Sequence, residues 1–515
     1  MRIEIARARP TDRSVAVIPL IGPDLTLPPS LEERERASCQ ADIAAMAYRG
    51  EAGEVLDVSP PSGSPFSRIL LIGVANESGR AAAGWEQLGG QLPRQAARLH
   101  AKSLTIMMPA EALNGVDGGE ALRSVALGAL LTAPADNPFR TWSRDRAPSL
   151  GLLTLMVPGD VNGLAAGLRE VEVIAEAVRE TRRRIMAPPN IMTPRALIAE
   201  AETLSQDGIV VETFLGDDAL AQKFPGTRAV GSGSAEESGA AIMVWMGAGA
   251  DKPVSVAISA KGVTFDSGGL TPKGEFDQRL MKIDMCGASA AIAVMGAIAR
   301  LKLPINVVAG FGAVENLSGG AAFKSGDILR MGNGTCVEVT YPDAEGRLVM
   351  ADMNCYLAEC YDPDVLINLA ALTYTAVAAL GDDCMALFSN DDDLADGVMR
   401  ASEAVGETFW RLPVGPRYLK LLTSHIADMK NMVAANQWGL LAGSASAASE
   451  FLRHFAGERK WANLDIFAAI WRPKDHDLGP AGATGEPVRT LIRLLQDEAA
   501  KLVARSIGTS EAVGQ

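Results

Sequence analysis

Residues 254–311 read VSVAISAKGVTFDSGGLTPKGEFDQRLMKIDMCGASAAIAVMGAIARLKLPINVVAGF. The apolar runs at the two ends of this stretch, Val254–Ser259 and Ile305–Phe311, predict buried strands. Between them, Ala288–Arg300 is long and apolar enough for a buried helix. A strand, a helix and a second strand in this order are typical of an α/β fold with a mainly parallel sheet.

The same alternation of strands and helices continues on both sides of this stretch. Toward the N-terminus we predict strands at Ser14–Ile21, Arg68–Val74 and Ser103–Met108, and helices at Ala81–Leu99 and Gly119–Leu131. Toward the C-terminus we predict a buried strand at Val365–Leu369, and helices at Arg195–Ser205, Ala445–Phe455 and Val488–Arg505.

A domain boundary is indicated where a helical stretch, from about Asn162 to Arg184, runs into MAPPN (Met186–Asn190). The two prolines of this segment end a helix, and Thr193-Pro194 is a signal for the start of the next one. We therefore expect a smaller N-terminal α/β domain over 1–165 and a helical linker over 166–190. A larger C-terminal α/β domain with a mixed, mainly parallel central sheet would follow over 191–515.

Charge and composition restrict the class of partner. The chain has 515 residues and a formal net charge of -14, from 62 acidic and 48 basic residues, which disfavours nucleic acid as a partner. The six cysteines form no C-x-x-C pair, so we expect reduced, mostly buried thiols. The N-terminal residues contain no apolar segment of the kind found in signal peptides. The longest apolar runs, Met285–Ala299 and Val365–Gly381, are shorter than a typical membrane span, so we expect buried elements of a soluble protein without a membrane partner.

Several common catalytic motifs are absent from the sequence. The chain contains no H-E-x-x-H, no G-x-S-x-G and no Walker A motif. Its four histidines, His100, His425, His454 and His476, are scattered along the chain. A zinc site carried by histidines on one helix is therefore excluded.

Carboxylates and lysines gather instead around the segments that flank the predicted strands. KGVTFDSGGLTPK (Lys261–Lys273) follows the strand predicted at Val254–Ser259, so we expect it to leave the sheet at its carboxyl edge, where ligand sites of α/β folds lie. Asp284, and Asp343 with Glu345, precede apolar stretches that look helical. Unpaired carboxylates are costly beside apolar segments, which makes metal ions a plausible counter-charge. Oxygen ligands suit Mg²⁺, Mn²⁺ or Zn²⁺.

Each of these residues also has an ordinary structural interpretation. Asp343 and Asp284 are suitable helix N-caps, and Asp266 before Ser267-Gly268-Gly269 is a normal turn residue. Lys261 and Lys273, taken alone, are surface lysines. Spacing and composition therefore predict no more than a possible metal site.

Taken together, three segments resemble the leucyl (cytosol) aminopeptidase family: KGVTFDSGG (Lys261–Gly269), MKIDMCGA (Met281–Ala288) and DAEGRL (Asp343–Leu348). Other segments are similar to further blocks of that family: RRRIMAPPNIMTP (Arg182–Pro194), LPINVVAGFGAVENLSGGAAFKSGDIL (Leu303–Leu329), NLAALT (Asn368–Thr373), IADMKN (Ile426–Asn431), KWANLDI (Lys460–Ile466) and GATGEPVRTLI (Gly482–Ile492). The resemblance covers the chain from about Arg182 to the C-terminal helix, and more weakly the N-terminal domain.

The resemblance implies a cytoplasmic metallo-exopeptidase that removes N-terminal amino acids from peptides, with the C-terminal domain catalytic and six subunits in a homo-hexamer. It implies two divalent metal ions, zinc or manganese or else magnesium, and a bicarbonate. One metal site would use Lys261, Asp266, Asp284 and Glu345, and the second, exchangeable one Asp266, Asp343 and Glu345. Lys273 and Arg347 match the two catalytic positions, and Arg347 matches the position that holds bicarbonate.

The residue types suit that chemistry. Two metal ions close together activate water and polarise a carbonyl. Lys261 can bind a metal only as the neutral amine, so we expect burial and two adjacent cations to lower its pKa. Lys273, kept cationic, would stabilise an oxyanion, and the planar guanidinium of Arg347 suits a planar anion.

The chain departs from the family pattern around the expected substrate pocket. Tyr341-Pro342 stands where the family usually has Asn-Thr, and Tyr374 follows NLAALT where the family has glycine. By resemblance, Met281 and Tyr374 line the pocket for the first side chain of the substrate. The stretch MVAANQWGLLAG (Met432–Gly443), with bulky Trp438, replaces a glycine-rich one. Our hypothesis is that this pocket is narrowed or reshaped, so a preference for leucine does not follow.

Three other functions remain as alternatives: a DNA-binding regulator, which is a second role known in the family, a pseudo-enzyme kept for assembly, and a two-metal phosphoester hydrolase. The acidic balance disfavours the first, and the retention of all seven matched positions disfavours the second. A neutral lysine ligand fits the third poorly, because phosphate chemistry favours cationic lysines.

Overall fold

The computed structural model describes residues 1–7, 9–10, 13–21, 25–75, 81–108, 118–134, 138–139, 149–156 and 164–513. The chain forms two compact units. The first contains Met1–Glu176 and Lys474–Ala481, and the second contains Ala177–Pro473 and Gly482–Gln515. Helix α4 (Leu164–Met186) runs through the division, and the start predicted for it at Asn162 lies outside the described residues.

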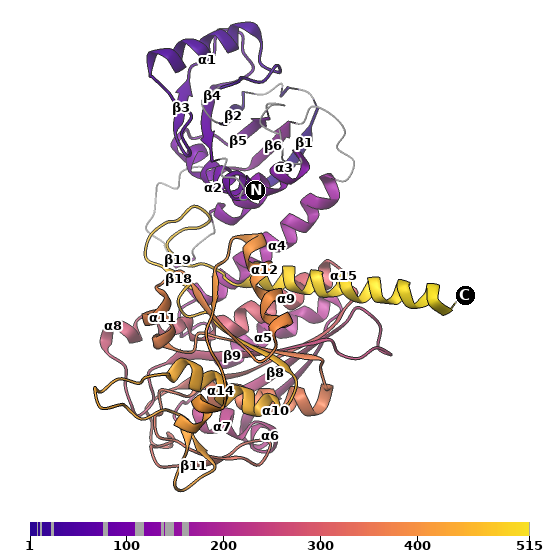
Figure 1. Ribbon diagram of the computed structural model, residues 1–515. Coiled ribbons are helices and arrows are strands. Elements are labelled where there is room, and N and C mark those ends of the chain that lie inside the picture. The colour runs from indigo at the N-terminus through magenta and orange to yellow at the C-terminus, as the bar shows by residue number, and fades with distance from the viewer. Residues whose placement is uncertain are drawn as a thin grey trace. The chain divides into compact units, whose positions relative to one another are not determined.

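The first unit is built around a six-stranded sheet in the order β1-β6-β5-β2-β4-β3 (Figure 1). Every neighbouring pair is parallel except β3 and β4. Its strands are β1 (Arg2–Ala6), β2 (Val15–Ile21), β3 (Val55–Val58), β4 (Arg68–Val74), β5 (Ser103–Met107) and β6 (Leu152–Met156). Its helices are α1 (Glu33–Ala45), α2 (Ala81–Arg98) and α3 (Gly118–Thr132). The strand-helix alternation predicted for this part is confirmed within one residue at most ends.

The second unit contains an eight-stranded mixed sheet in the order β15-β14-β17-β13-β9-β10-β8-β7. The four central strands are parallel to one another, and antiparallel pairs lie on both sides of them. The strands are β7 (Val210–Leu215), β8 (Gly239–Met246), β9 (Val256–Asp266), β10 (Asn306–Asn316), β13 (Val365–Ala370), β14 (Met385–Ser389), β15 (Phe409–Arg411) and β17 (Lys460–Asp465). The mixed, mainly parallel sheet predicted from the sequence is confirmed.

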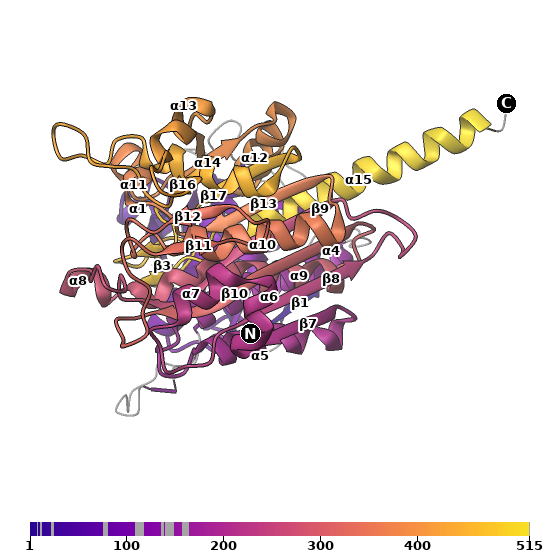
Figure 2. The ribbon, with the colours of Figure 1, turned by 90° about the horizontal axis from the view of Figure 1, so that it is seen from below.

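Two layers of helices cover this sheet (Figures 1 and 2). Helix α9 packs on β9, β10 and β13, with α5 and α15 beside it, and α10 packs on β9 and β10, with α7 and α14 beside it. The helices and 3₁₀ turns are α5 (Pro194–Glu202), η2 (Thr203–Asp207), α6 (Gly216–Lys223), α7 (Pro225–Gly231), α8 (Glu275–Gln278), η3 (Met281–Met285), α9 (Cys286–Arg300), α10 (Gly346–Tyr361), α11 (Tyr374–Leu380), α12 (Asp392–Val405), α13 (Pro416–Leu419), η4 (Lys420–Leu422), α14 (Ser444–Ala456) and α15 (Val488–Val513). Two small sheets complete the unit: β11 (Ile328–Arg330) with β12 (Cys336–Glu338) and β16 (Met429–Lys430), and β18 (Trp471–Arg472) with β19 (Gly482–Ala483).

Helix α9 forms part of the core. Met281–Arg300 is the one helical stretch in the described part of the chain that is long and apolar enough to cross a membrane, and 94% of its most apolar window is buried inside the structure. A helix that is apolar on all sides packs in this way in the core of a large domain. The stretch therefore gives no argument for a membrane.

The prediction that the sheet ends before Lys261 was wrong. Strand β9 continues to Asp266, and its residues pair with β10 as far as Asn316, with one register shift after Val314. The charged residues at 261 and 266 interrupt the apolar pattern, whereas the backbone pairing does not depend on side-chain type. Lys261 is therefore held by the sheet itself.

The cysteines are less buried than expected. All six are free, but only Cys39, Cys286 and Cys355 are buried, and Cys360 is exposed.

Candidate active site

A cavity of about 120 Å³ opens in the second unit at the carboxyl ends of β9 and β13. All nine residues predicted for the site line this cavity: Lys261, Asp266, Lys273, Met281, Asp284, Asp343, Glu345, Arg347 and Tyr374. They come from β9 and the loop after it, from η3, from the start of α10 and from the start of α11. Segments more than a hundred residues apart thus meet at one edge of the sheet, as α/β folds bring ligand groups together.

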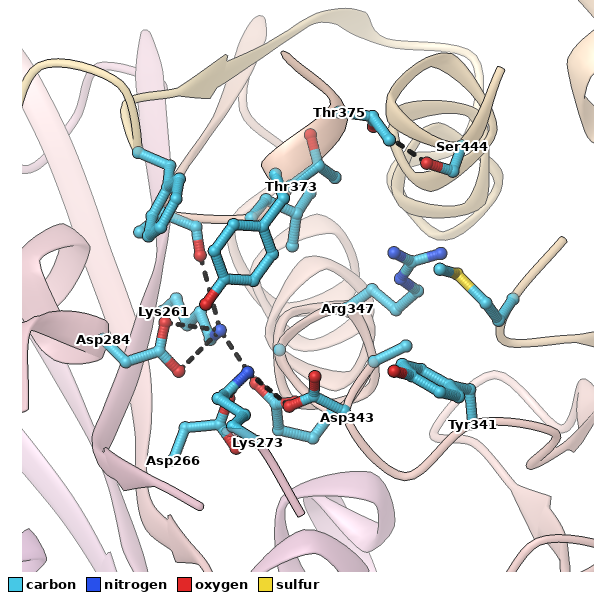
Figure 3. Close-up of a pocket in the computed structure, with 18 of the residues that line it drawn as sticks. Lys261, Asp266, Lys273, Asp284, Tyr341, Asp343, Arg347, Thr373, Thr375 and Ser444 are labelled. Atoms are coloured by element: carbon cyan, nitrogen blue, oxygen red, sulfur yellow. Dashed lines mark hydrogen bonds and ion pairs between the residues drawn. The ribbon is translucent and has the colours of Figure 1, made fainter. Parts of the chain in front are cut away.

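Lys261 lies between two carboxylates. Its Nζ is 2.7 Å from both carboxylate oxygens of Asp284 and 2.8 Å from Oε1 of Glu345 (Figure 3). All three side chains are at least nine-tenths buried. The lysine stem fits beside Gly346, where an added Cβ would lie 2.7 Å from the lysine Nζ. A glycine at the start of α10 is therefore what leaves room for this lysine.

Lys273 lies between the other two carboxylates of the cavity. Its Nζ is 2.7 Å from Oδ2 of Asp266 and also forms an ion pair with Asp343 (Figure 3). The side chain of Lys273 is 7% exposed. Each lysine thus faces one pair of carboxylates, Lys261 on one side of the cluster and Lys273 on the other.

The charges of this cluster are not balanced. Four carboxylates face two lysines, and burial, together with the nearby carboxylates, raises the pKa of Asp266 and of Asp284. Burial and the charge of Glu345 raise the pKa of Asp343 to about 7. Carboxylate oxygens of Asp266, Asp343 and Glu345 lie within 4.8 Å of one another, close enough to share an ion. Oδ2 of Asp284 and Oδ1 of Asp343 are buried and, although each faces an ammonium group, neither accepts a well-aligned hydrogen bond. The cluster therefore fits divalent cations.

Without bound cations, the pKa of Lys261 is higher than its ordinary value, whereas we expected it to be lower. Burial lowers the pKa of this lysine, but Asp284 and Glu345 outweigh burial and raise it above its ordinary value. Burial by itself is therefore not enough to make Lys261 a neutral ligand. The neutral amine requires cations that take over the two carboxylates.

Arg347 lines the same cavity and lies away from the two lysines (Figure 3). Its Nη1 donates a 2.7 Å hydrogen bond to the carbonyl oxygen of Asn431, whereas its buried Nε has no hydrogen-bond partner among the described residues. Burial lowers the pKa of Arg347 to about 10, so the guanidinium stays charged at neutral pH. A buried cation with an unused donor is suited to a small anion.

An apolar wall closes the other side of the cavity. The hydroxyl of Tyr374 lies 4.0 Å from the sulfur of Met281, and the Tyr374 ring meets the ring of Phe467 edge-on at 4.7 Å between centroids. Nζ of Lys273 lies 5.7 Å from the centroid of the Tyr374 ring. Tyr374 therefore lies between the other predicted pocket residue, Met281, and the predicted catalytic lysine.

Three supporting residues were missed by the sequence analysis. Nδ2 of Asn316 donates a 2.8 Å hydrogen bond to Oδ1 of Asp266. Asp465 accepts hydrogen bonds from the Leu372 amide and the Thr373 hydroxyl, and Asn431 fixes the 340–344 loop through both ends of its amide. Asn316 carried no signal of its own, because the strand predicted at Ile305–Phe311 stops before it, whereas β10 continues to Asn316.

The ordinary structural interpretations are mostly wrong. Lys261 and Lys273 are buried rather than on the surface. Helix α10 has Glu345 and not Asp343 at its N-cap, and Asp284 lies inside the turn η3. Asp266 does accept the turn hydrogen bond of 2.9 Å from the Gly268 amide, in addition to its contacts in the cluster.

Comparison with known proteins decides the family. Residues 179–492 match the model of the cytosol aminopeptidase family, catalytic domain, and residues 33–142 match the model of that family's N-terminal domain. The chain belongs to the cytosol aminopeptidase family. Membership makes it a metal-dependent aminopeptidase, and therefore a hydrolase.

Relatives resemble this family member over nearly its whole length. A probable cytosol aminopeptidase of Gluconobacter oxydans is 35% identical over 90% of this chain and 91% of its own. One of Roseiflexus castenholzii is 35% identical over 87% of this chain and 91% of its own. Among solved structures, the bottromycin maturation enzyme BotP in complex with Mn is 29% identical, with a TM-score of 0.81 over 94% of this chain and 99% of its own. A mutant of tomato leucine aminopeptidase is 25% identical, with a TM-score of 0.81 over 96% of both chains.

Proposed function

We propose that this family member hydrolyses the first peptide bond of peptides with two divalent metal ions and a bound bicarbonate. The observation that carries the proposal is the buried cluster in which each of two lysines faces its own pair of carboxylates. In each group, two carboxylates face one ammonium group, so negative charge is in excess. One bound cation in each group would offset that excess. A fold kept only for assembly would not need to keep four buried carboxylates together.

We propose two metal sites within this cluster. Lys261, Asp284 and Glu345 would hold one ion, together with Asp266. Asp343 would hold the second ion, with Asp266 and Glu345 shared between the two. When bound, the ions would supply Lewis-acid activation of a water molecule and of the scissile carbonyl. Manganese is a candidate because the structure of BotP contains Mn, and zinc and magnesium are the others.

The two catalytic cations would act on the peptide. Lys273 would stabilise the negative charge that develops on the carbonyl oxygen as water adds to the carbonyl carbon. Its ion pairs with Asp266 and Asp343 keep it charged, since they raise its pKa against the effect of burial. Arg347 would hold bicarbonate through its unused Nε, at a position from which a proton can pass to the leaving amine.

The experiment that tests the proposal is hydrolysis of a panel of aminoacyl p-nitroanilides with added Mn²⁺, repeated with a chelator. We expect turnover that the chelator abolishes and that Mn²⁺ restores. Absence of turnover on every substrate, with two metal ions measured per chain, would refute the proposal. Lys273→Met is the matched variant, because it removes the charge of a residue proposed to act in catalysis but not to bind metal.

The assembly and location follow from the same family membership. We propose peptides as the substrates, a homo-hexamer as the assembly and the cytoplasm as the location, without a nucleic-acid or membrane partner. The relatives are described as probable cytosol aminopeptidases, which supports the location. Sedimentation of the purified protein tests the assembly, since a mass six times the 54.1 kDa of one chain is expected.

A further inference from the structure

Tyr374 reaches across the cavity rather than away from it. It is the first residue of α11, and its hydroxyl lies 4.0 Å from the sulfur of Met281, which comes from the start of η3. Both residues line the cavity, and they come from two different segments of the chain. The ring of Tyr374 therefore spans the space between α11 and η3.

This position of the ring is fixed by its neighbours. Phe467 meets the ring edge-on at 4.7 Å, and Nζ of Lys273 lies 5.7 Å from its centroid. At the base of the side chain, Oγ1 of Thr373 donates a 2.6 Å hydrogen bond to the buried Asp465. Tyr374 is 49% exposed as a whole, and its ring and hydroxyl contact Phe467, Lys273 and Met281.

The first side chain of a substrate would meet this wall. In the proposed reaction the carbonyl oxygen lies at Lys273, and we place the free α-amine of the peptide at one of the two metal ions, within the carboxylate cluster. The first side chain is attached to the carbon between these two groups, so it starts within a few bonds of Lys273. The apolar surface next to Lys273 on this side is formed by Met281, Tyr374 and Phe467.

Little room remains at this position. The whole cavity has about 120 Å³, and the same space must take the metal ions as well as the substrate. A closed cavity of roughly 150 Å³ holds one benzene molecule. A leucyl side chain, with four carbon atoms, would therefore compete with the Tyr374 ring for this space.

We propose that Tyr374 closes the pocket for the first side chain, so that the enzyme selects peptides that begin with glycine or alanine. This inference rests on the proposed function, because it takes the orientation of the substrate from it. Met281 and Phe467 serve as the surfaces against which the Tyr374 ring is held. Specificity thus comes from a side chain that fills the pocket and not from one that recognises the substrate.

The test compares the wild-type enzyme with Tyr374→Ala, which removes the ring, and Tyr374→Phe, which keeps the ring and removes only the hydroxyl. For the wild type we expect kcat/KM on glycyl and alanyl substrates to exceed that on leucyl substrates by at least about tenfold. In Tyr374→Ala the ratio should move toward leucine by about tenfold or more, because the added side chain then has room. In Tyr374→Phe the ratio should stay within about twofold of the wild type.

A binding measurement separates this inference from the proposed function. The affinities of glycine hydroxamate and leucine hydroxamate for the Mn²⁺-loaded protein are measured by calorimetry, with circular dichroism to confirm that each variant is folded. A wild type that binds or cleaves leucyl compounds as well as glycyl ones, or an unchanged ratio in Tyr374→Ala, overturns the inference. If no variant cleaves any substrate, the proposed function fails, and the ratio of the two hydroxamate affinities still decides whether Tyr374 closes the pocket.

Discussion

Asp266 and Asn316 end two neighbouring parallel strands in register, and the amide of Asn316 donates a 2.8 Å hydrogen bond to Oδ1 of Asp266. The same amide nitrogen lies 3.5 Å from Oε2 of Glu345 and 3.2 Å from the carbonyl oxygen of Pro342. Asn316 therefore touches both carboxylates that are proposed to be shared by the two metal ions. Its role is to fix their orientation, as the outer partners of metal ligands commonly do.

Replacing Asn316 should weaken metal binding. For Asn316→Ala we expect a loss of about 10- to 100-fold in affinity for Mn²⁺, because Asp266 loses the donor that orients it. Titration calorimetry measures the affinity. Asn306→Ala is the matched control, since Asn306 is equally buried at the other end of β10 and its side chain bonds to the 248–253 loop. An equal loss of affinity in both variants would contradict the orienting role of Asn316.

The two buried lysines should separate metal binding from catalysis. Lys261→Met removes a proposed ligand, so we expect fewer metal ions per chain after dialysis, as measured by elemental analysis. Lys273→Met should keep both ions, because it removes only a competing positive charge from Asp266 and Asp343. Its kcat should fall by about 10²- to 10³-fold, the usual cost of losing an oxyanion donor. Loss of metal in Lys273→Met to the same extent as in Lys261→Met would argue against these separate roles.

Gly346→Ala should disturb Lys261 without unfolding the protein. The new methyl group would press on the flexible end of the lysine side chain, which can move away from Glu345. We expect about tenfold weaker metal binding with a nearly unchanged melting temperature. Gly287→Ala is the contrast, because its Cβ would collide with the backbone carbonyl of Leu369, and we expect marked destabilisation there. A large loss of stability in Gly346→Ala would show that the Lys261 side chain cannot move away from the new methyl group.

Asp352 should make stability depend on pH. This buried carboxylate on α10 accepts hydrogen bonds from the Gly226, Thr227 and Gly332 amides, yet burial raises its pKa from 3.8 to about 7. The folded state therefore binds this proton more tightly than the unfolded state, and the group costs stability as pH rises from about 4 to about 7.

Asp352→Asn removes this titration. Between about pH 5 and pH 8, the free energy of unfolding of the variant should gain roughly 2–3 kcal/mol relative to that of the wild type. Urea denaturation at the two pH values measures the difference. A constant difference between the two proteins would mean that Asp352 is ionised throughout this range.

The fold was largely predictable from the sequence, because apolar runs and turn residues mark where elements lie. Ala288–Arg300 and Val365–Leu369 were placed within two residues of α9 and β13. The ends of β9 and β10 were not predicted, because backbone hydrogen bonds continue a strand even where its side chains are charged. Nor did the sequence indicate that Lys474–Ala481 would join the first unit, because that depends on contacts between distant segments. The domain bounds predicted at 165 and 190 stay a prediction.

The candidate site was predictable only in part. The resemblance named nine residues for the site, and the structure brings all nine to one cavity. Their roles in metal binding and catalysis stay a prediction. Which lysine faces which carboxylates did not follow from spacing, since Lys273 lies on an irregular loop. Asn431 and Asp465 act by hydrogen bonds from loops and strand ends far along the chain, and single residues of that kind leave no pattern in a sequence.

The position of β17 governs when the enzyme becomes complete during its synthesis. This strand, Lys460–Asp465, lies between β13 and β14, both of which leave the ribosome long before it. Until residue 465 has emerged, the large sheet has a gap, and neither Asp465 nor Phe467 supports the pocket. The four carboxylates are already present in the growing chain by residue 345. The proposed metal ligands are thus synthesised early and the residues that support the proposed substrate pocket late, so the pocket can be completed only near the end of synthesis.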